Sequence, residues 1–91
     1  MPRIFVTHRV RDYAEWRQGY DADAERRSGA GLSEVGHFHS ADDPNQFIIV
    51  WDSEHSLEDT MAMVSGMMSD PDLARLMEEA GVLEKPDFWV A

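Results

Sequence analysis

Apolar and polar residues alternate over residues 4–10, which is the period of a β-strand with one buried face. Ile4, Val6, His8 and Val10 fall on one side of this predicted strand, while Phe5, Thr7 and Arg9 fall on the other. A second pattern, Phe47-Ile48-Ile49-Val50-Trp51, is apolar on both sides. Such a run is typical of a strand in the middle of a sheet. Weaker patterns predict strands over 32–40, with Ser33, Val35, His37 and His39 on one side and Leu32, Glu34, Gly36 and Phe38 on the other, and over 87–91.

Between these strands the spacing of apolar residues changes to three and four, as in amphipathic helices. Asp12 followed by Glu15 predicts a helix from residue 12 to Gly29, with an aromatic stripe of Tyr13, Trp16 and Tyr20. A second helix is predicted over 53–69, beginning at Ser53 or at the capping box of Ser56 and Asp59. Its apolar stripe is Leu57, Met61, Val64 and Met68, with Met67 at the edge. Asp70-Pro71 opens a third helix that ends at Gly81.

The predicted order is strand, helix, strand, strand, helix, extra helix, strand. This is the α+β ferredoxin-like βαββαβ arrangement with an extra helix before the last strand, in which a four-stranded antiparallel sheet has the order 4-1-3-2. Residues 1–91 therefore form one domain. Helices would cover one face of the sheet, and the other, largely apolar face would be covered by a second copy of the chain. We therefore expect a homodimer.

Charge and composition narrow the function classes. The formal net charge of −10 leaves no basic face for phosphates, so we expect no nucleic-acid partner and no binding to anionic membranes. The chain has no cysteine, which excludes disulfides and thiolate metal sites. There is no long apolar run, no signal-peptide pattern and no nucleotide, serine-hydrolase or zinc-protease motif. These features favour a cytoplasmic protein with a small neutral or organic ligand.

His8 is the first candidate for chemistry. It lies near the end of an otherwise apolar strand, where a histidine needs a hydrogen-bond partner, and the ordinary pKa of the side chain suits a general base. The alternative is a structural histidine that bonds to the start of the next helix.

His37 and His39 share one face of their strand, about 6.6 Å apart. In the predicted order they lie toward the same end of the sheet as His8, but strand 46–52 separates the two strands by about 9–10 Å. No carboxylate completes a ligand set, so we expect no metal. A solvated pair at the sheet edge is one interpretation, and a role of His37 beside His8 as a second catalytic residue is the other.

The aromatic and methionine side chains are candidates for a binding wall, composed of Tyr13, Trp16, Tyr20, Trp51, Met61 and Met67. The alternative is that they are core residues. Arg9 and Arg17 either hold an acidic group of a substrate or form surface ion pairs.

Several segments together resemble the dimeric α+β barrel superfamily, and more narrowly its small cyclase-like and antibiotic-biosynthesis-monooxygenase-like proteins. They are His8-Arg9-Val10 leading to Asp12-Tyr13 and Trp16, then Asp42-Asp43-Pro44-Asn45, Ser69-Asp70-Pro71-Asp72-Leu73, and Ala80-Gly81-Val82 before Pro86. The resemblance implies a homodimer with a pocket between sheet and helices in each subunit. It also implies oxidation of aromatic polyketides without metal, flavin or haem. No catalytic residue of those relatives corresponds to a position of this chain.

The leading hypothesis is therefore a cofactor-free monooxygenase or cyclase that acts on an aromatic or polyketide-like compound, with His8 as the acid/base group. A non-catalytic ligand-binding or scaffold dimer is the second. The third is haem binding or degradation, as in other members of the superfamily, with His55 as a possible axial ligand.

Overall fold

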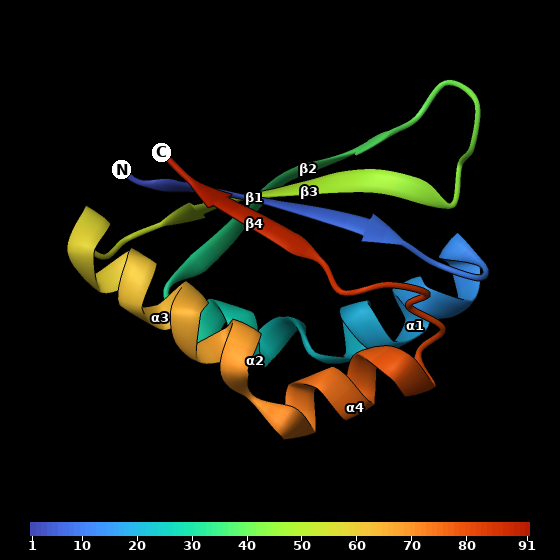
Figure 1. Cartoon of the computed structure of the whole chain (residues 1–91). Helices are drawn as coiled ribbons and strands as arrows, with labels where there is room; N and C mark the ends of the chain where they lie inside the picture. Colours follow the sequence, from blue (N-terminus) through green and yellow to red (C-terminus); the bar gives the residue numbers. More distant parts are fainter.

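The computed structural model describes residues 1–91 and has the element order expected from the sequence (Figure 1). A four-stranded sheet in the order β2-β3-β1-β4 lies on a layer of helices, and all neighbouring strands are antiparallel. The elements are β1 (Arg3–Arg9), α1 (Tyr13–Ala22), α2 (Ala24–Gly29), β2 (Leu32–His39), β3 (Gln46–Ser53), α3 (Leu57–Ser69), α4 (Pro71–Glu79) and β4 (Asp87–Val90). The ferredoxin-like fold with its extra helix, α4, is thus confirmed.

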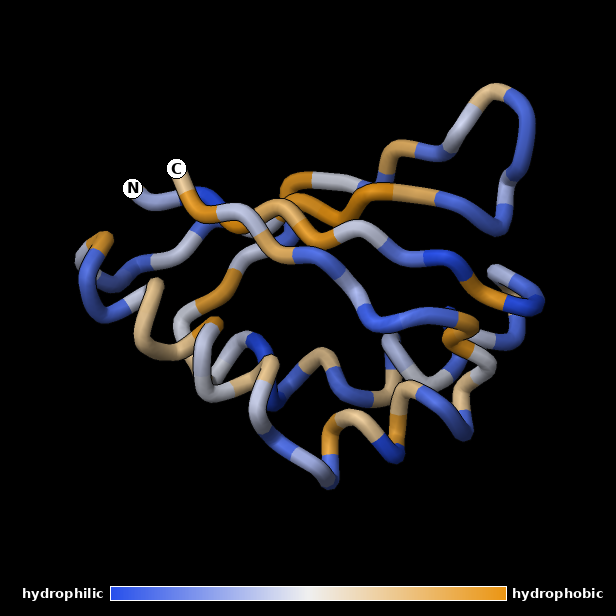
Figure 2. Tube along the Cα trace, in the orientation of Figure 1, coloured by the Kyte–Doolittle hydropathy of each residue, from blue (hydrophilic) through white to orange (hydrophobic).

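The core lies between the sheet and the helices. β1 and β3 occupy the centre of the sheet, and the register pairs Ile4 with Trp51, Val6 with Ile49 and His8 with Phe47. All six residues are buried. Figure 2 shows the most hydrophobic segments of the chain along these strands. The predicted grouping of Ile4, Val6 and His8 on one face of the first strand and the central position of the third are both confirmed, and the structure shows that this face is the inward one.

Helix starts follow the capping residues seen in the sequence. Asp12 accepts a hydrogen bond from the backbone N–H of Glu15, and Ser56 accepts one from Asp59. Asp70 does the same for α4, which has Pro71 at its first position. Of the two predicted starts for the second helix, the one at Ser56 is the observed one.

The predicted single helix over 12–29 is wrong in one respect, because it is interrupted at Asp23. Aspartate is a poor residue for a helix interior, since its short carboxylate competes for nearby donors. Here it accepts hydrogen bonds from the Arg26 guanidinium at 2.6–2.9 Å. The chain therefore continues as a separate short helix, α2, which carries Arg26 and Arg27.

The predicted faces of the second strand are also partly wrong. β2 contains a β-bulge between Glu34 and Gly36, so Glu34 is opposite Trp51 and His37 is opposite Ile49. The extra residue, Val35, shifts the alternation by one position. As a result Glu34 lies on the helix-facing side together with His37, whereas strict alternation separates the two.

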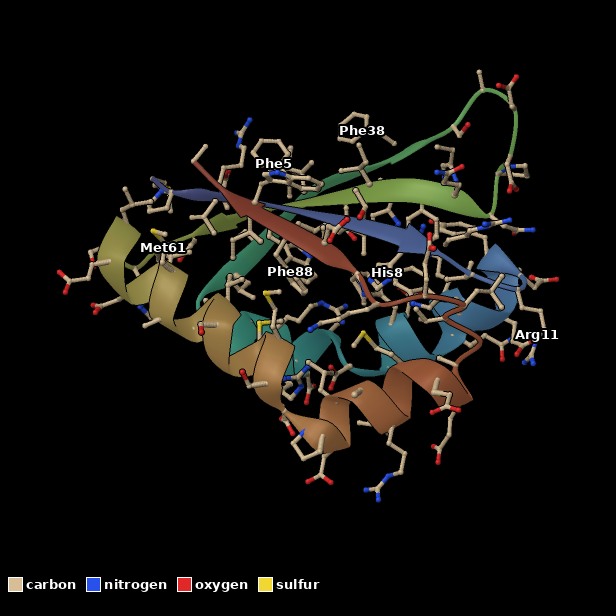
Figure 3. The ribbon with its side chains drawn as sticks, viewed as in Figure 1. Phe5, His8, Arg11, Phe38, Met61 and Phe88 are labelled. Atoms are coloured by element: carbon tan, nitrogen blue, oxygen red, sulfur yellow. The ribbon has the colours of Figure 1, made fainter.

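The other face of the sheet is bare in the single chain. Figure 3 shows Phe5 and Phe38 on this side, opposite His8 and the helices. Phe38, Ile48 and Trp89 are 56 %, 40 % and 55 % exposed. No helix of the structure has the length and apolar character needed to cross a membrane.

Candidate functional site

A cavity of about 320 Å³ lies between the helix-facing side of the sheet and the helix layer. Its volume is at the lower end of the range of roughly 300–1,000 Å³ that is usual for small-molecule sites. Of the residues predicted from the sequence, His8, Trp16, Tyr20, Trp51 and Met67 line it. The remaining walls come mainly from α2, α4 and β4, through Arg26, Arg27, Leu73, Leu76, Met77, Ala80 and Phe88.

His8 is the unusual member of this lining. It is only 7 % exposed, and its buried Nδ1 has no hydrogen-bond partner. The ring is packed against aromatic neighbours, with centroids 5.3 Å from Trp16 and 5.7 Å from Phe47. Burial, with a smaller effect from nearby His37, lowers the pKa of His8 from 6.5 to about 4. The imidazole is therefore neutral at pH 7, and is a weaker base than its ordinary pKa suggested.

Backbone geometry places His8 there. The alternation of β1 turns His8 to the same side as Ile4 and Val6. The chain then enters α1 within a few residues, and Trp16, on the first turns of that helix, covers the imidazole. The predicted alternative, a bond from His8 to the start of the next helix, is not what the structure shows for Nδ1.

His37 has a different environment. Its side chain is 6 % exposed, and both ring nitrogens have partners. Nδ1 lies 2.8 Å from the Tyr13 hydroxyl, and Nε2 contacts the Glu34 carboxylate. The Tyr13 hydroxyl in turn accepts a hydrogen bond from Arg17 at 2.7 Å. Burial lowers the pKa of His37, although the adjacent Glu34 acts in the opposite direction.

The same Glu34 oxygen is bonded from a second side. The Tyr20 hydroxyl donates to Glu34 Oε1 at 2.8 Å and accepts from Trp51 Nε1 at 2.9 Å. Burial raises the pKa of Tyr20 to about 12, so this hydroxyl keeps its proton. Two donor chains therefore converge on Glu34, one from Trp51 through Tyr20 and one from Arg17 through Tyr13 and His37. This order requires the neutral His37 to carry its proton on Nε2.

Trp16 stands between the two histidines. Its ring centroid is 5.3 Å from that of His8 and 5.9 Å from that of His37. Trp16 lines the cavity, as do two members of the hydrogen-bonded network, Tyr20 and Trp51. The other members of the network do not line it: Arg17, Tyr13, His37 and Glu34. The two predicted catalytic histidines are thus close in space but are not part of one open site.

Three predicted site residues do not line the cavity: Tyr13, His37 and Met61. Tyr13 and His37 belong to the network instead. Met61 is 55 % exposed because it lies at the edge of the α3 face that buries Thr60 and Val64, and Figure 3 shows it at the far end of the molecule from His8. Trp51 was expected at the other end of the sheet from His8. The strand register agrees with this, because Trp51 pairs with Ile4 near the start of β1 and Phe47 pairs with His8 near its end. The cavity is long enough to reach both.

Sequence reasoning missed Glu34 and the two arginines of α2. Gly36 was the available signal for Glu34, because an isolated glycine in a strand often marks a bulge. Nothing comparable pointed to Arg26 and Arg27, since their position depends on the break at Asp23. Arg17 was expected to form an ion pair and does so with Asp21, in addition to its bond to Tyr13.

The structure gives little support to a haem or metal site. His55 Nε2 is bonded to the carbonyl of Ala30 at 2.7 Å, which ties the end of α2 to the loop before α3, and His55 does not line the cavity. His39 is exposed and bonded to the carbonyl of Pro44. No three histidine or carboxylate side chains are grouped as metal ligands.

Several solved structures have the same fold as this chain. A proposed antibiotic biosynthesis monooxygenase from Bordetella bronchiseptica matches with a TM-score of 0.70 and 17 % identity, over 99 % of this chain and 93 % of the other. A nipsnap family protein of unknown function from Agrobacterium tumefaciens matches with a TM-score of 0.64 and 20 % identity, over 100 % and 86 %. An uncharacterized NIPSNAP-like domain protein from Burkholderia xenovorans matches with a TM-score of 0.63 and 14 % identity, over 98 % and 81 %.

No family model matches the sequence, and no curated protein does. At these identities the structural matches establish the fold and nothing finer. The chain has the ferredoxin-like fold that is also found in antibiotic-biosynthesis-monooxygenase-like and NIPSNAP-like proteins. The resemblance inferred from the sequence is confirmed at that level.

Proposed function

We propose that the protein is a cofactor-independent enzyme, of monooxygenase or cyclase type, that acts on an aromatic or polyketide-like small molecule. One observation carries the proposal: a buried histidine with an unpartnered ring nitrogen lies in the wall of an otherwise largely apolar cavity of ligand size. Unpartnered buried polar atoms are rare in folded proteins and often have a functional reason. The shared fold with proteins named as monooxygenases also supports it.

The aromatic lining suits a flat substrate. Trp16, Tyr20, Trp51 and Phe88 provide apolar ring surfaces, and Met67 and Met77 provide side chains that adapt to different shapes. Most of the binding free energy would come from the burial of apolar area, at about 25 cal/mol per Å². His8 would supply the polar contact that orients the ring.

In the proposed reaction His8 accepts a proton from a carbon or hydroxyl that is acidified by neighbouring carbonyl or aryl groups. A pKa of about 4 in the empty cavity disfavours the imidazolium because burial removes its hydration. The substrate anion formed beside it supplies the missing counter-charge, so the pKa of His8 rises when substrate is bound. The proton therefore moves only when a substrate of this kind is present.

Two outcomes follow from the same anion. In oxygenation the electron-rich carbon reduces O₂ and bonds to it, and loss of water leaves a carbonyl, so that CH₂ and O₂ become C=O and H₂O. In cyclisation the anion attacks a carbonyl of its own chain, and His8 returns the proton to the new oxygen. Both require the protein to bind, deprotonate and exclude water.

The test is turnover of an anthrone-type panel, followed by O₂ consumption and by product analysis. We expect His8→Gln to lower turnover about 100-fold, since positioned general bases contribute roughly 10²–10⁴-fold. His55→Gln is the matched control, because His55 does not line the cavity. Turnover by His8→Gln equal to that of the wild type would remove His8 from the mechanism. Reaction without O₂ would distinguish cyclisation from oxygenation.

The low pKa of His8 favours a second candidate, a protein that binds such ligands without transforming them. A neutral imidazole is a good hydrogen-bond partner for a ligand hydroxyl. In that case the panel binds with measurable affinity, binding weakens in His8→Gln, and no product forms over long incubation.

We further propose that the chain functions as a homodimer through the bare face of its sheet. Apolar surface is exposed there by Phe38, Ile48 and Trp89. Ile48 lies on the central strand β3, Phe38 pairs with it, and Trp89 pairs with Phe5 of the other central strand, β1. Light scattering of the wild type should give twice the chain mass, and Trp89→Asp should give the monomer. A monomeric wild type at micromolar concentration would contradict this proposal.

A further inference from the structure

Arg27 lines the cavity and forms no direct ion pair, although the Asp23 carboxylate, which also lines the cavity, interacts with it at longer range. Both Arg26 and Arg27 line the cavity, but Arg26 is paired with Asp23 at 2.6 Å. Arg3, Arg11, Arg17 and Arg75 are also in ion pairs. In a chain with a net charge of −10, carboxylate partners are abundant. An arginine that lines the cavity and has no carboxylate directly paired with it therefore stands out.

The geometry of Arg27 leaves its hydrogen-bond donors available. Its guanidinium carbon lies 3.5 Å from the centroid of the Tyr20 ring, so one flat side is covered by the aromatic ring. Such stacking holds the guanidinium plane in place and leaves the N–H groups at its edge free. A fork of N–H groups held in this way matches a planar carboxylate with two parallel hydrogen bonds.

Arg27 and His8 lie in different parts of the cavity. Tyr20, on which Arg27 stacks, is bonded to Trp51, and Trp51 is opposite Ile4 in the sheet. The Trp16 ring lies next to both Tyr20 and His8, with its centroid 4.7 Å from that of Tyr20 and 5.3 Å from that of His8. The lining between them includes the apolar Ile49, Trp16 and Phe88. A ligand that contacts both must therefore be elongated and apolar in its middle.

From these observations we propose that the cavity selects an elongated, largely aromatic carboxylic acid, whose carboxylate is bound by Arg27 while its other end reaches His8. The inference rests on the proposed function, because it names the substrate class of the same cavity. The carboxylate is favoured over a phosphate because a single stacked guanidinium in an apolar cavity neutralises one charge, whereas a phosphate monoester carries nearly two.

Calorimetric titration with two ligands of the same shape tests this proposal: biphenyl-4-carboxylic acid and biphenyl-4-carboxamide. The wild type should bind the acid at least about tenfold more tightly, the equivalent of 1.4 kcal/mol. Arg27→Gln should bind both ligands with similar affinity. Arg27→Lys should keep part of the preference for the acid, because lysine retains the positive charge but cannot form two parallel hydrogen bonds. Arg75→Gln, which alters an exposed ion pair on α4, is the control and should keep the full preference.

The outcomes separate this inference from the proposed function. Equal binding of acid and amide by the wild type overturns the carboxylate proposal and leaves the cavity as a ligand site. An undiminished preference in Arg27→Gln also overturns it. Equal weakening of both ligands in Arg27→Gln shows that Arg27 only packs on Tyr20, and the proposal fails. If neither ligand binds the wild type, this inference fails, and the proposed function is decided separately by the anthrone-type panel.

Discussion

The surroundings of His8 and His37 differ sharply although both side chains are buried on the same side of the sheet. His37 has a partner at each ring nitrogen, in a network that ties α1 to β2 and β3. His8 has an unpartnered Nδ1 and a cavity beside it. Trp16 separates them.

The comparison shows how burial alone fails to identify a reactive group. Both histidines have a lowered pKa for the same first reason, the loss of hydration. For His37 the hydrogen bonds replace much of what water provided, so its network is stable without a ligand. For His8 Nδ1 nothing in the chain replaces it. An unpartnered Nδ1 in a residue that lines the cavity distinguishes His8 from the fully bonded His37.

Removal of the separating ring should have the largest effect on this arrangement. Trp16 is 5 % exposed and contacts both regions, so Trp16→Ala should lower the free energy of unfolding by about 3–5 kcal/mol in urea denaturation. Leu76→Ala is the control, because Leu76 lines the cavity but is 59 % exposed, and it should cost less than about 1 kcal/mol. A loss below about 1 kcal/mol for Trp16→Ala would show that the two regions do not depend on the ring.

The second-largest effect should be on the pH dependence of stability, to which the unpartnered His8 contributes. Because the pKa of His8 is about 4 when folded and 6.5 when unfolded, the unfolded chain binds an extra proton between these values. The contribution of neutral His8 to the free energy of unfolding is therefore complete above pH 6.5. About 3 kcal/mol of the free energy of unfolding is lost as the pH falls to 4. His8→Leu should lack this part of the loss.

Urea denaturation of the two proteins from pH 8 to pH 4 measures that difference. The carboxylates titrate in both proteins, so their effects cancel in the comparison, and the effect of His37 on His8 is the smaller cause of the lowered pKa. At pH 7 His8→Leu should be as stable as the wild type or more stable, because it removes a buried polar atom that has no partner. Parallel pH profiles for the two proteins would show that His8 is not held neutral by burial.

The network around His37 should give the smallest of the three effects. Glu34→Ala leaves the Tyr20 hydroxyl and His37 Nε2 without an acceptor, which should cost about 1–2 kcal/mol, since water replaces part of the contact at a side chain that is 40 % exposed. Glu25→Ala, on an exposed position of α2, is the control. The pKa of His37, followed by NMR, should fall further in Glu34→Ala, because Glu34 acts to raise it. An unchanged pKa would contradict the assigned contact.

Much of the site could be predicted because it follows from local periodicity. The period-two pattern placed His8 on the same side of its strand as Ile4 and Val6, and the helical spacing placed Trp16 and Tyr20 on one stripe. Met61 was misplaced for a related reason: an apolar stripe on a helix is wider than the strip that reaches the core, and its edge is exposed. Periodicity identifies a face of an element, and it does not say which residues on that face border a cavity.

The amino-acid sequence by itself determined the order of the strands along the chain, the helix starts at Asp12 and Asp70, the sheet order and the face of β1 that His8 shares with Ile4 and Val6. These depend on interactions within a few residues or on topology rules that hold across folds. Only the tertiary structure decided the bulge at Val35, the break at Asp23 and the space beside His8. Each of these results from packing between segments that are distant in the sequence, where one extra residue in a strand or one turn between helices changes which side chains meet. Tertiary packing therefore decides that His37 is fully hydrogen-bonded and that Nδ1 of His8 has no partner.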